Sequence, residues 1–261
     1  WVSVTSSADG TKLAAVATNR GVFTSTNSGA SWKEQANPGA KKWTSIAGSA
    51  DGTKLAATVA DGVVYTSTDS GVTWMERPIT GLPAPQKWTA LASSADGSNL
   101  AAAAWGGTIH TSRDGGATWT EQPKSEVRNW VSIASSADGS KLAALYDWGG
   151  YIITSQDGGA TWRKHAMSGS INWMSIASSA DGNKLVAVAK DHAIYTSRDG
   201  GATWTEQPGS GSRKWRAVTS SADGNKLAAV VEGGAIYTSL DGGKTWTERA
   251  QAGNRTWTSI A

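Results

Sequence analysis

The sequence predicts an all-β fold in which six small antiparallel sheets close into a ring, and three observations predict it. A pattern of the form Ser-x-Asp-x-Gly-x-Thr-Trp occurs six times, with Asn27 and Ser31 as substitutes in the first copy. A tryptophan opens each repeat, and successive openings lie 42 to 45 residues apart. The 31 glycines and the single Phe fit a chain rich in turns and poor in helix. Repeats of this length made of short strands are typical of a six-bladed β-propeller with four antiparallel strands per blade.

The repeats follow one another without a linker, so we expect a single domain over residues 1–261. Its opening tryptophans are Trp1, Trp43, Trp88, Trp130, Trp173, Trp215 and Trp257. The repeats cover residues 1–42, 43–87, 88–129, 130–172, 173–214 and 215–256. Residues 257–261 repeat the opening segment a seventh time, so one copy is surplus to a ring of six. We expect this segment to displace the first copy, to lie frayed, or to mark a cut from a longer array. A seventh blade is less economical, because a partner molecule would have to supply its remaining strands.

The fifth repeat shows how each element is expected to form. Residues 173–179 alternate in the two-residue rhythm of a strand, and residues 184–189, 193–197 and 203–207 are short runs of small, β-branched or aromatic residues. Asp181-Gly182 lies between the first and second of these segments, and Asp199-Gly200 lies between the third and fourth. Asp-Gly is typical of a tight hairpin. The repeat therefore predicts four antiparallel strands with Asp-Gly turns at two of three hairpins.

The second Asp turn of each repeat is expected to be structural. Its carboxylate accepts hydrogen bonds from backbone N–H groups two or three residues ahead. The tryptophan that follows offers a large apolar surface, which we expect to fill the gap between neighbouring sheets. These structural positions are Asp69, Asp114, Asp157, Asp199, Asp241, Trp32, Trp74, Trp119, Trp162, Trp204 and Trp246.

The turn copies resemble the Asp-boxes of BNR (bacterial neuraminidase) repeats, which occur in sialidases and in many β-propellers. Flanking segments such as Ile-Tyr-Thr-Ser-x-Asp-Gly-Gly-Ala-Thr-Trp at 194–204 also resemble propellers related to photosystem II assembly factors. The resemblance covers the whole chain and specifies the fold far better than the activity, because the motif occurs in enzymes, lectins and scaffolds alike. In such propellers the Asp-boxes lie opposite the ligand face, which implies that these aspartates are architectural.

A sialidase activity would require further residues, which the resemblance names. Family members use three arginines around the substrate carboxylate, a Tyr paired with a Glu, and an acid/base Asp. Only Arg216 lies in an opening segment, and four of the five tyrosines lie in or beside the third strand. The acidic loop residues Asp61, Asp147, Asp191 and Glu232 are scattered. We expect no catalytic residue and no enzyme activity, and keep a glycoside hydrolase as the second alternative.

The composition of the chain bears on whether it binds a metal, a cofactor, a membrane or nucleic acid. The chain has no cysteine, and His110, His165 and His192 occupy different places in their repeats, so we expect no metal site and no cofactor. No apolar stretch is long enough to cross a membrane. The formal charge of +3 makes nucleic acid an unfavoured partner. A monomer is expected, and a secreted or periplasmic location is slightly favoured.

The copies diverge in two loops, which in a propeller share one face. One loop joins the second and third strands, and the other joins one repeat to the next. The loops between repeats carry Lys41, Lys42, Lys87, Lys124, Arg128, Arg213, Lys214 and Arg255 against the single acid Glu126. Such a cluster focuses a positive potential over the loop face. Trp105 and Trp148 break the repeat pattern there, either to contact a ligand or to cover a gap between blades.

The loop face is therefore the candidate ligand-binding surface, and its variation is explained either by specialisation or by drift. We expect a non-catalytic binding module, lectin-like, with an anionic or glycan ligand; the first alternative is a protein-interaction scaffold with no small ligand. The candidate ligand-binding residues are Arg20, Lys42, Lys87, Trp105, Arg128, Trp148, His192, Lys214 and Arg255.

Overall fold

The computed structural model describes residues 1–79, 86–147, 149–167 and 171–261. The described chain consists of β-strands and three short 3-10 turns, and none of its helices could span a membrane. It divides into two compact units, unit 1 from Trp1 to Trp130 and unit 2 from Val131 to Ala261. Each unit is described by itself.

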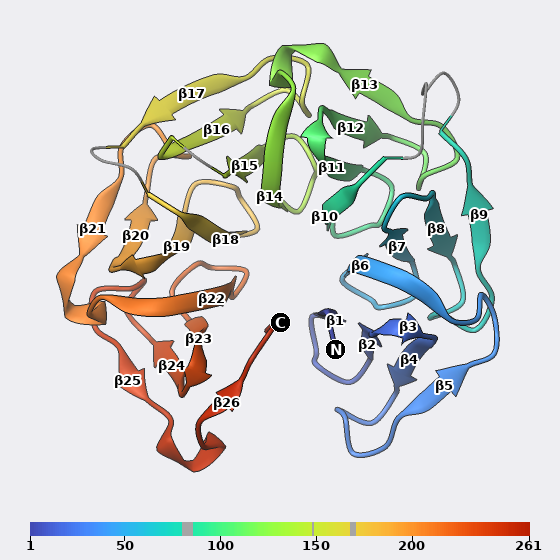
Figure 1. The fold of residues 1–261 in the computed structure, drawn as a ribbon, viewed down its shortest axis with the longest axis horizontal. Helices are drawn as coiled ribbons and strands as arrows, with labels where there is room; N and C mark the ends of the chain where they lie inside the picture. Colours follow the sequence, from blue (N-terminus) through green and yellow to red (C-terminus); the bar gives the residue numbers. More distant parts are fainter. Residues whose placement is uncertain (80–85, 148, 168–170) are drawn as a thin grey trace. The chain divides into compact units, whose positions relative to one another are not determined.

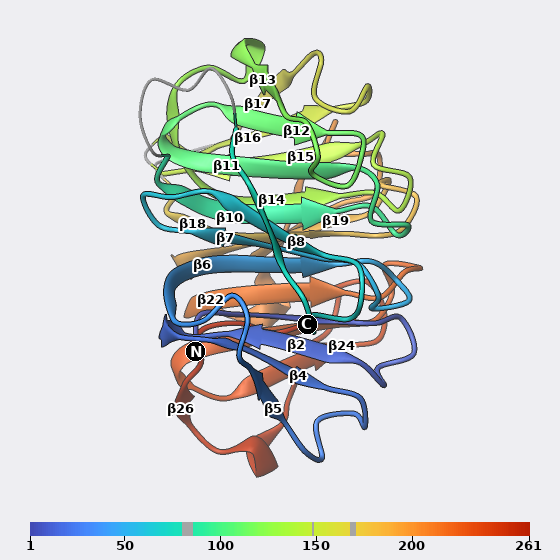
Figure 2. The same cartoon turned by 90° about the vertical axis from the view of Figure 1, so that its right-hand side faces the viewer.

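Unit 1 contains three four-stranded antiparallel sheets, with the strands in sequence order from one edge to the other. Sheet 1 consists of β1 (Ser3–Ser6), β2 (Leu13–Val16), β4 (Val22–Ser25) and β5 (Lys33–Gln35). Sheet 2 consists of β6 (Lys41–Gly48), β7 (Leu55–Val59), β8 (Val64–Ser67) and β9 (Met75–Arg77). Sheet 3 consists of β10 (Trp88–Ser93), β11 (Leu100–Gly107), β12 (Ile109–Ser112) and β13 (Thr120–Gln122). Figure 2 shows β2, β6 and β11 as successive layers of this unit.

Unit 2 repeats the arrangement, with β14 crossing the unit boundary. Sheet 4 consists of β14 (Arg128–Ser135), β15 (Leu142–Tyr146), β16 (Tyr151–Ser155) and β17 (Arg163–Ala166). Sheet 5 consists of β18 (Trp173–Ser178), β19 (Leu185–His192), β20 (Ile194–Ser197) and β21 (Thr205–Gln207). Sheet 6 consists of β22 (Arg213–Ser220), β23 (Leu227–Gly234), β24 (Ile236–Ser239) and β25 (Thr247–Glu248). The four strands predicted for the fifth repeat are confirmed, although β19 runs on to His192.

The first strands of neighbouring sheets lie next to one another within each unit, as β6 and β10 do in unit 1 and β18 and β22 do in unit 2 (Figure 1). Each of these strands carries a bulge directly after its tryptophan: Trp43 pairs with Val59, but the next pair is Ser45 with Thr58. A bulge adds one residue and redirects the strand. The added residue is Thr44, Thr89, Met174 or Arg216 in the four sheets with this irregularity, so the bulge is a position at which the copies differ.

The opening tryptophans form the centre of the core. Trp43, Trp88, Trp130, Trp173 and Trp215 are each at most 1% exposed. Most donate from Nε1 to a carbonyl of the preceding sheet or its linker, as Trp88 does to Gly62 (3.1 Å) and Trp130 to Gly107 (3.0 Å). Each indole in sheets 2, 3, 5 and 6 meets a third-strand ring edge-on, at 5.2 to 5.5 Å between centroids. These residues therefore join one sheet to the next.

Four of the Asp-turn tryptophans pack, as predicted, against core clusters that combine residues of their own sheet and of the preceding one: Trp74, Trp119, Trp204 and Trp246. Trp74 is 8% exposed, but Trp32 is 41% exposed and the other four are half-buried. They cover the edge of the core, since Trp246 lies 6.1 Å from the buried Trp215. The opening tryptophan occupies the centre because its strand has a sheet on each side, whereas the turn lies at the end of the outer hairpin.

The Asp turns satisfy their own polar groups. Thr73 donates to Asp69 from its backbone N–H (2.8 Å) and from Oγ1 (2.6 Å), and Ser67 Oγ donates to the same carboxylate (2.8 Å). The bonded N–H is four residues ahead, not two or three as predicted, because the intervening Gly71 N–H donates to Ser67 Oγ (2.9 Å). Asn27 accepts the corresponding bond from Ser31 (2.9 Å).

A second set of aspartates stabilises the turn between the first and second strands of each sheet. Asp9 accepts from the Thr11 N–H (3.0 Å) and from Ser7 Oγ (2.6 Å), and these bonds lower its pKa to about 2. Neighbouring turns are joined through their backbones: in unit 1 the Ala8 N–H donates to the Ala50 carbonyl and the Ala50 N–H to the Ala95 carbonyl, both at 2.7 Å. Unit 2 repeats this from Ala137 to Ala180 to Ala222. The turn end of each sheet is thus fixed by local bonds.

The two ends of the chain show where the surplus segment lies. β1 pairs with β2, so the final segment does not displace the first copy, and that explanation is wrong. β26 (Arg255–Thr256) pairs with β23, and Trp257 Nε1 donates to the Gly234 carbonyl (3.0 Å). Trp257 therefore makes toward sheet 6 the bond that Trp130 makes toward sheet 3. The single closed ring of six blades remains a prediction.

Candidate ligand-binding surface

At four places among the described residues, a sheet is joined to the linker that follows it by a short ladder at the end opposite the Asp turns. The chain extends the second strand, turns back, and pairs with the linker that leads into the next sheet. We call these pairs the linker ladders. In unit 1 they are Thr18–Lys42 and Arg20–Lys41, which join β3 (Thr18–Arg20) to β6, and Trp105–Asn129 and Gly107–Arg128. In unit 2 they are Lys190–Lys214 and His192–Arg213, and Glu232–Thr256 and Gly234–Arg255. The two variable loops therefore form one structure.

The residue at the tip of the turn between the second and third strands adopts a left-handed backbone conformation, with positive φ. Asn19, Asp61, Gly106, Asp191 and Gly233 occupy this position with φ between 51° and 67°. Asn, Asp and Gly tolerate this region better than other residues. Two of the four acidic loop residues of the sequence, Asp61 and Asp191, are thus explained by backbone conformation.

Two ladders place cations directly opposite cations. In unit 2, Lys190 faces Lys214 and His192 faces Arg213. In unit 1, Arg20 faces Lys41. Like charges directly opposite one another destabilise a strand pair. The only ion pair among the described residues is Arg128 with Glu126, so no acid on the described chain forms a salt bridge with Lys190 or Lys214.

Some of these cations are held by aromatic rings. Lys41 Nζ lies 4.9 Å from the centre of the Tyr65 ring, and the Arg213 guanidinium lies 4.6 Å from that of Tyr237. The phenol of Tyr65 donates to Glu76 (2.9 Å). Arg20, opposite Lys41, is exposed, whereas Arg213 lies opposite the half-buried His192. The facing residues Lys190 and Lys214 are both exposed. The unit 1 ladder therefore contains one anchored and one solvent-facing cation, and the Lys190–Lys214 pair of unit 2 is solvent-facing on both sides.

The tyrosine–glutamate pairs have the composition of a sialidase nucleophile but not its setting. Tyr65 with Glu76 and Tyr237 with Glu248 (2.7 Å) join third to fourth strands. Burial raises the pKa of both tyrosines, which disfavours the phenolate that would attack a substrate. The pairs brace the outer half of each sheet.

Comparison with known proteins identifies the motif and the fold. The BNR/Asp-box repeat family matches residues 195–206 and 237–248. The chain carries BNR/Asp-box repeats. The structure is similar to YCF48 from Cyanidioschyzon merolae (TM-score 0.74, 18% identity, covering 97% of this chain and 86% of that one) and to YCF48 bound to D1 peptide (0.72, 15%, 96% and 82%). It is also similar to an ancestral GH74 enzyme (0.68, 18%, 99% of this chain and 38% of that one).

The fold is that of a β-propeller, and the resemblance of the Asp-boxes and of the flanking segments to known propellers is confirmed. No curated protein matches the sequence. At these identities the structural likeness shows the fold alone. The Asp-boxes lie at the turn end of every sheet, away from the linker ladders.

Most of the predicted binding residues lie on or beside the linker ladders. Arg20, Lys42, Lys214 and Arg255 are exposed members of ladders, and Lys87 is exposed just before β10. The remaining described members are His192, half-buried opposite Arg213; Arg128, paired with Glu126; and Trp105, 41% exposed opposite Asn129. Trp148 lies outside the described residues. Arg20, Lys42, Lys87, Trp105 and Arg128 belong to unit 1, and His192, Lys214 and Arg255 to unit 2.

Sequence reasoning passed over Lys190 as a binding residue. It lies in a loop that the sequence marks as variable, but only the strand register places it opposite Lys214. Arg216, at the bulge of β22, is exposed, whereas Thr44, Thr89 and Met174 at the same position are half-buried. The sequence already distinguishes Arg216 as the one cation of an opening segment.

The three histidines have three different settings. His110 is 1% exposed beneath Trp88, and neither ring nitrogen has a hydrogen-bond partner among the described residues. Burial lowers its pKa. His165 Nε2 lies 2.8 Å from Thr154 Oγ1, and His192 lies on a ladder. The described residues contain no cluster of three or more His, Cys, Asp or Glu residues that could hold a metal ion.

Proposed function

We propose that this chain is a non-catalytic β-propeller binding module whose linker ladders bind an acidic segment of a protein partner. The observation that carries the proposal is the direct pairing of Lys190 with Lys214 and of Arg20 with Lys41. Such pairs cost stability in the free chain. An anion placed between the two cations removes that repulsion and adds charge-assisted hydrogen bonds.

The ladder geometry favours a peptide over a compact anion. A ladder residue and its partner project side chains on the same face of a two-stranded ribbon. Carboxylates spaced along an extended segment would therefore meet successive cations, Lys190 with Lys214 and then Arg213 in unit 2. YCF48 bound to D1 peptide shows that a propeller of this fold takes a peptide ligand, which supports this ligand class.

Two other functions have specific observations behind them. The exposed indole of Trp105 beside Arg128 suits stacking on a sugar ring, which would make the module lectin-like. The similarity to a GH74 enzyme keeps a glycoside hydrolase as the second alternative. Glu232, which pairs with Thr256 in a linker ladder, is the acidic residue that an active site at the ladder end would use. Neither accounts for cations that face one another.

The test is a titration of a fluorescent glutamate-rich peptide into the purified chain. The double variant K190A/K214A should weaken binding roughly tenfold, since exposed charge pairs contribute up to about 1 kcal/mol each. The matched control is K226A/K244A, which removes two exposed lysines from the turn end. Binding should also weaken as salt rises, because surface charges are screened.

The same preparation separates the alternatives. Equal affinity in wild type, K190A/K214A and K226A/K244A would sink the acidic-peptide proposal. Retention on a glycan array that is lost in the W105A variant would favour the lectin. Turnover of an aryl sialoside or glucoside that is lost in the E232Q variant would favour the enzyme.

A further inference from the structure

A cavity of about 260 Å³ lies between sheets 2 and 3 of unit 1, at the turn end. The corresponding grooves between sheets 1 and 2 and between sheets 5 and 6 enclose only about 10 Å³ each. All three grooves are lined by corresponding residues of the repeats, for example Leu13, Leu55 and Leu185 on the second strands. The difference therefore has a local cause.

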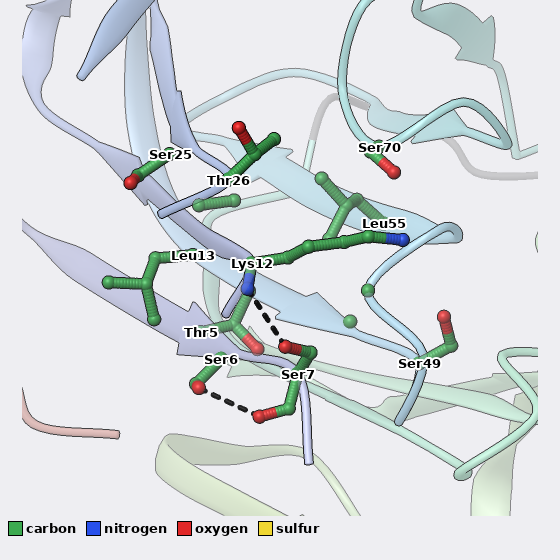
Figure 3. A pocket seen from close by; sticks show the side chains of 13 residues that line it. Thr5, Ser6, Ser7, Lys12, Leu13, Ser25, Thr26, Ser49, Leu55 and Ser70 are labelled. Carbon is green, nitrogen blue, oxygen red and sulfur yellow. Dashed lines mark hydrogen bonds between the residues drawn. The ribbon is translucent and has the colours of Figure 1, made fainter. Parts of the chain in front are cut away.

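Long cationic side chains bridge the two small grooves. Figure 3 shows Lys12 extended toward Leu55 and Ser70, and its Nζ donates to the Asp51 carbonyl of the next sheet (2.9 Å). Between sheets 5 and 6, Arg198 Nη2 lies 3.4 Å from the Asp241 carbonyl. The large groove has Thr68 at the position of Arg198. Lys54 packs on Gly97 of the next sheet, as Lys12 packs on Gly52, but among the described residues no hydrogen bond of its Nζ bridges the groove.

Arg77 supplies this groove with a fixed cation. Its position in sheets 1, 3 and 5 holds a glutamine whose Nε2 donates to a third-strand threonine at 2.7 Å. Arg77 makes the same bond from Nε to Thr66 Oγ1 (2.9 Å). An arginine bonded through Nε still has its terminal nitrogens, and those of Arg77 make no hydrogen bond or ion pair with the described residues.

The acid in the lining is already engaged. Asp114 accepts from the Thr118 N–H (2.8 Å) and from the hydroxyls of Thr118 (2.6 Å) and Ser112 (2.8 Å). These bonds, the Thr118 hydroxyl first, lower its pKa to about 2, so it remains ionised within its own turn. The rest of the lining combines two cations, Arg77 and Lys54, with apolar side chains and with hydroxyl groups and glycines. The apolar residues are Leu55, Ala56 and Leu100, and the others are Ser67, Thr68, Ser93, Ser98, Gly97 and Gly115.

We infer that this cavity binds a small organic carboxylate, with the carboxylate on the Arg77 guanidinium and an apolar body against Leu55, Ala56 and Leu100. Arginine binds carboxylates through two parallel N–H bonds. The volume approaches the lower end of ligand pockets, and the lining offers an apolar patch beside the oriented Arg77 guanidinium. This site lies at the opposite end of the sheets from the linker ladders and does not depend on the proposed function.

Benzoate is a suitable probe, followed by saturation-transfer NMR on the full chain. The R77Q variant keeps the bond to Thr66 that glutamine makes in sheets 1, 3 and 5, but removes the cation. Its matched control is R249Q, because Arg249 makes the same bond to Thr238 (2.7 Å) in sheet 6. The T68R variant places in this groove the residue that bridges the one between sheets 5 and 6.

Benzoate should bind to wild type and R249Q equally, and at least tenfold more weakly to R77Q and T68R. Inorganic phosphate should not compete with benzoate, because it lacks an apolar body. Unchanged binding in R77Q, an equal loss in R249Q, or competition by phosphate would each overturn the assignment.

Discussion

The two ends of each sheet use tryptophan and charge in opposite ways. At the ladder end, an opening tryptophan such as Trp43 is 1% exposed and donates to the Arg20 carbonyl of β3, while Arg20 itself faces Lys41. At the turn end, an Asp-box tryptophan such as Trp119 is half-buried, while every Asp is surrounded by donors. The ladder end thus combines the most deeply buried tryptophans with cations that face and repel one another.

This difference is the basis of the binding surface that we propose. Repulsion that a fold retains at one end, when its other end is fully satisfied, is typical of a surface that meets a ligand. The buried opening tryptophans supply the stability that allows the repulsion. The turn end fixes the shape, except in the groove between sheets 2 and 3.

The largest effect should come from the opening tryptophans. Trp88→Ala should cost about 4 kcal/mol of unfolding free energy, because it removes a fully buried indole, whereas Trp119→Ala should cost about 2 kcal/mol. Trp105→Ala, with its exposed side chain, should cost less than either. Urea unfolding of the three variants measures the order, and equal losses for Trp88 and Trp119 would remove the contrast between the two ends.

The Asp turns give the next effect. Asp114→Ala should cost about 1 kcal/mol, because three donors lose their acceptor and partly regain water. Asp114→Asn should cost less, since Asn27 performs this role in the first copy.

The Asp114 contribution should also depend on pH. The pKa of Asp114 is about 2 in the fold against an ordinary 3.8. Its contribution is therefore complete above about pH 4 and is lost as pH falls toward 2. Urea unfolding at pH 7 and pH 2.5 should show the difference between wild type and Asp114→Asn shrinking; a constant difference would contradict the carboxylate's role.

A substitution of His110 should have a smaller effect on the unfolding free energy, and of opposite sign. His110 holds the third-strand place of Tyr65, Tyr195 and Tyr237, and its two ring nitrogens are buried without a hydrogen-bond partner in the part of the chain that the structure describes. His110→Tyr should add about 1 kcal/mol by removing unsatisfied polar atoms, with Glu121 available to accept from the new hydroxyl.

The same substitution should change the pH response. Because burial lowers the pKa of His110, only the unfolded chain takes up the proton, so wild type should lose stability as pH falls below the ordinary value of 6.5. His110→Tyr should reduce that loss between pH 7 and 5, and His192→Tyr, at the ladder, should not. Thermal unfolding across this range measures both.

The smallest effect tests the electrostatics of the ladder end. Lys190→Ala should raise the unfolding free energy by a few tenths of a kcal/mol, because it relieves the repulsion with Lys214. Lys226→Ala, at the turn end, should leave it unchanged. A clear loss of stability in Lys190→Ala would mean that the ladder cations stabilise the fold, and would weaken the argument for a ligand.

The sequence by itself determined the strands, the turns and the propeller fold, because the two-residue alternation and the Asp-Gly turns are local features of each repeat. It also located the cationic loops, since these are the positions at which the copies differ. It predicted that the Asp-turn tryptophans pack between sheets, but not that the opening tryptophans are buried more deeply, because the pattern of a repeat does not reveal how much of a side chain the neighbouring sheets enclose.

Only the tertiary structure decided which residues meet. The pairing of Lys190 with Lys214 depends on a register across 24 residues, and the lining of the groove between sheets 2 and 3 comes from two different repeats. Such contacts join different repeats, so no single repeat encodes them. The physical reason is that turn chemistry acts within a few residues, whereas packing and charge act between segments that the fold alone brings together.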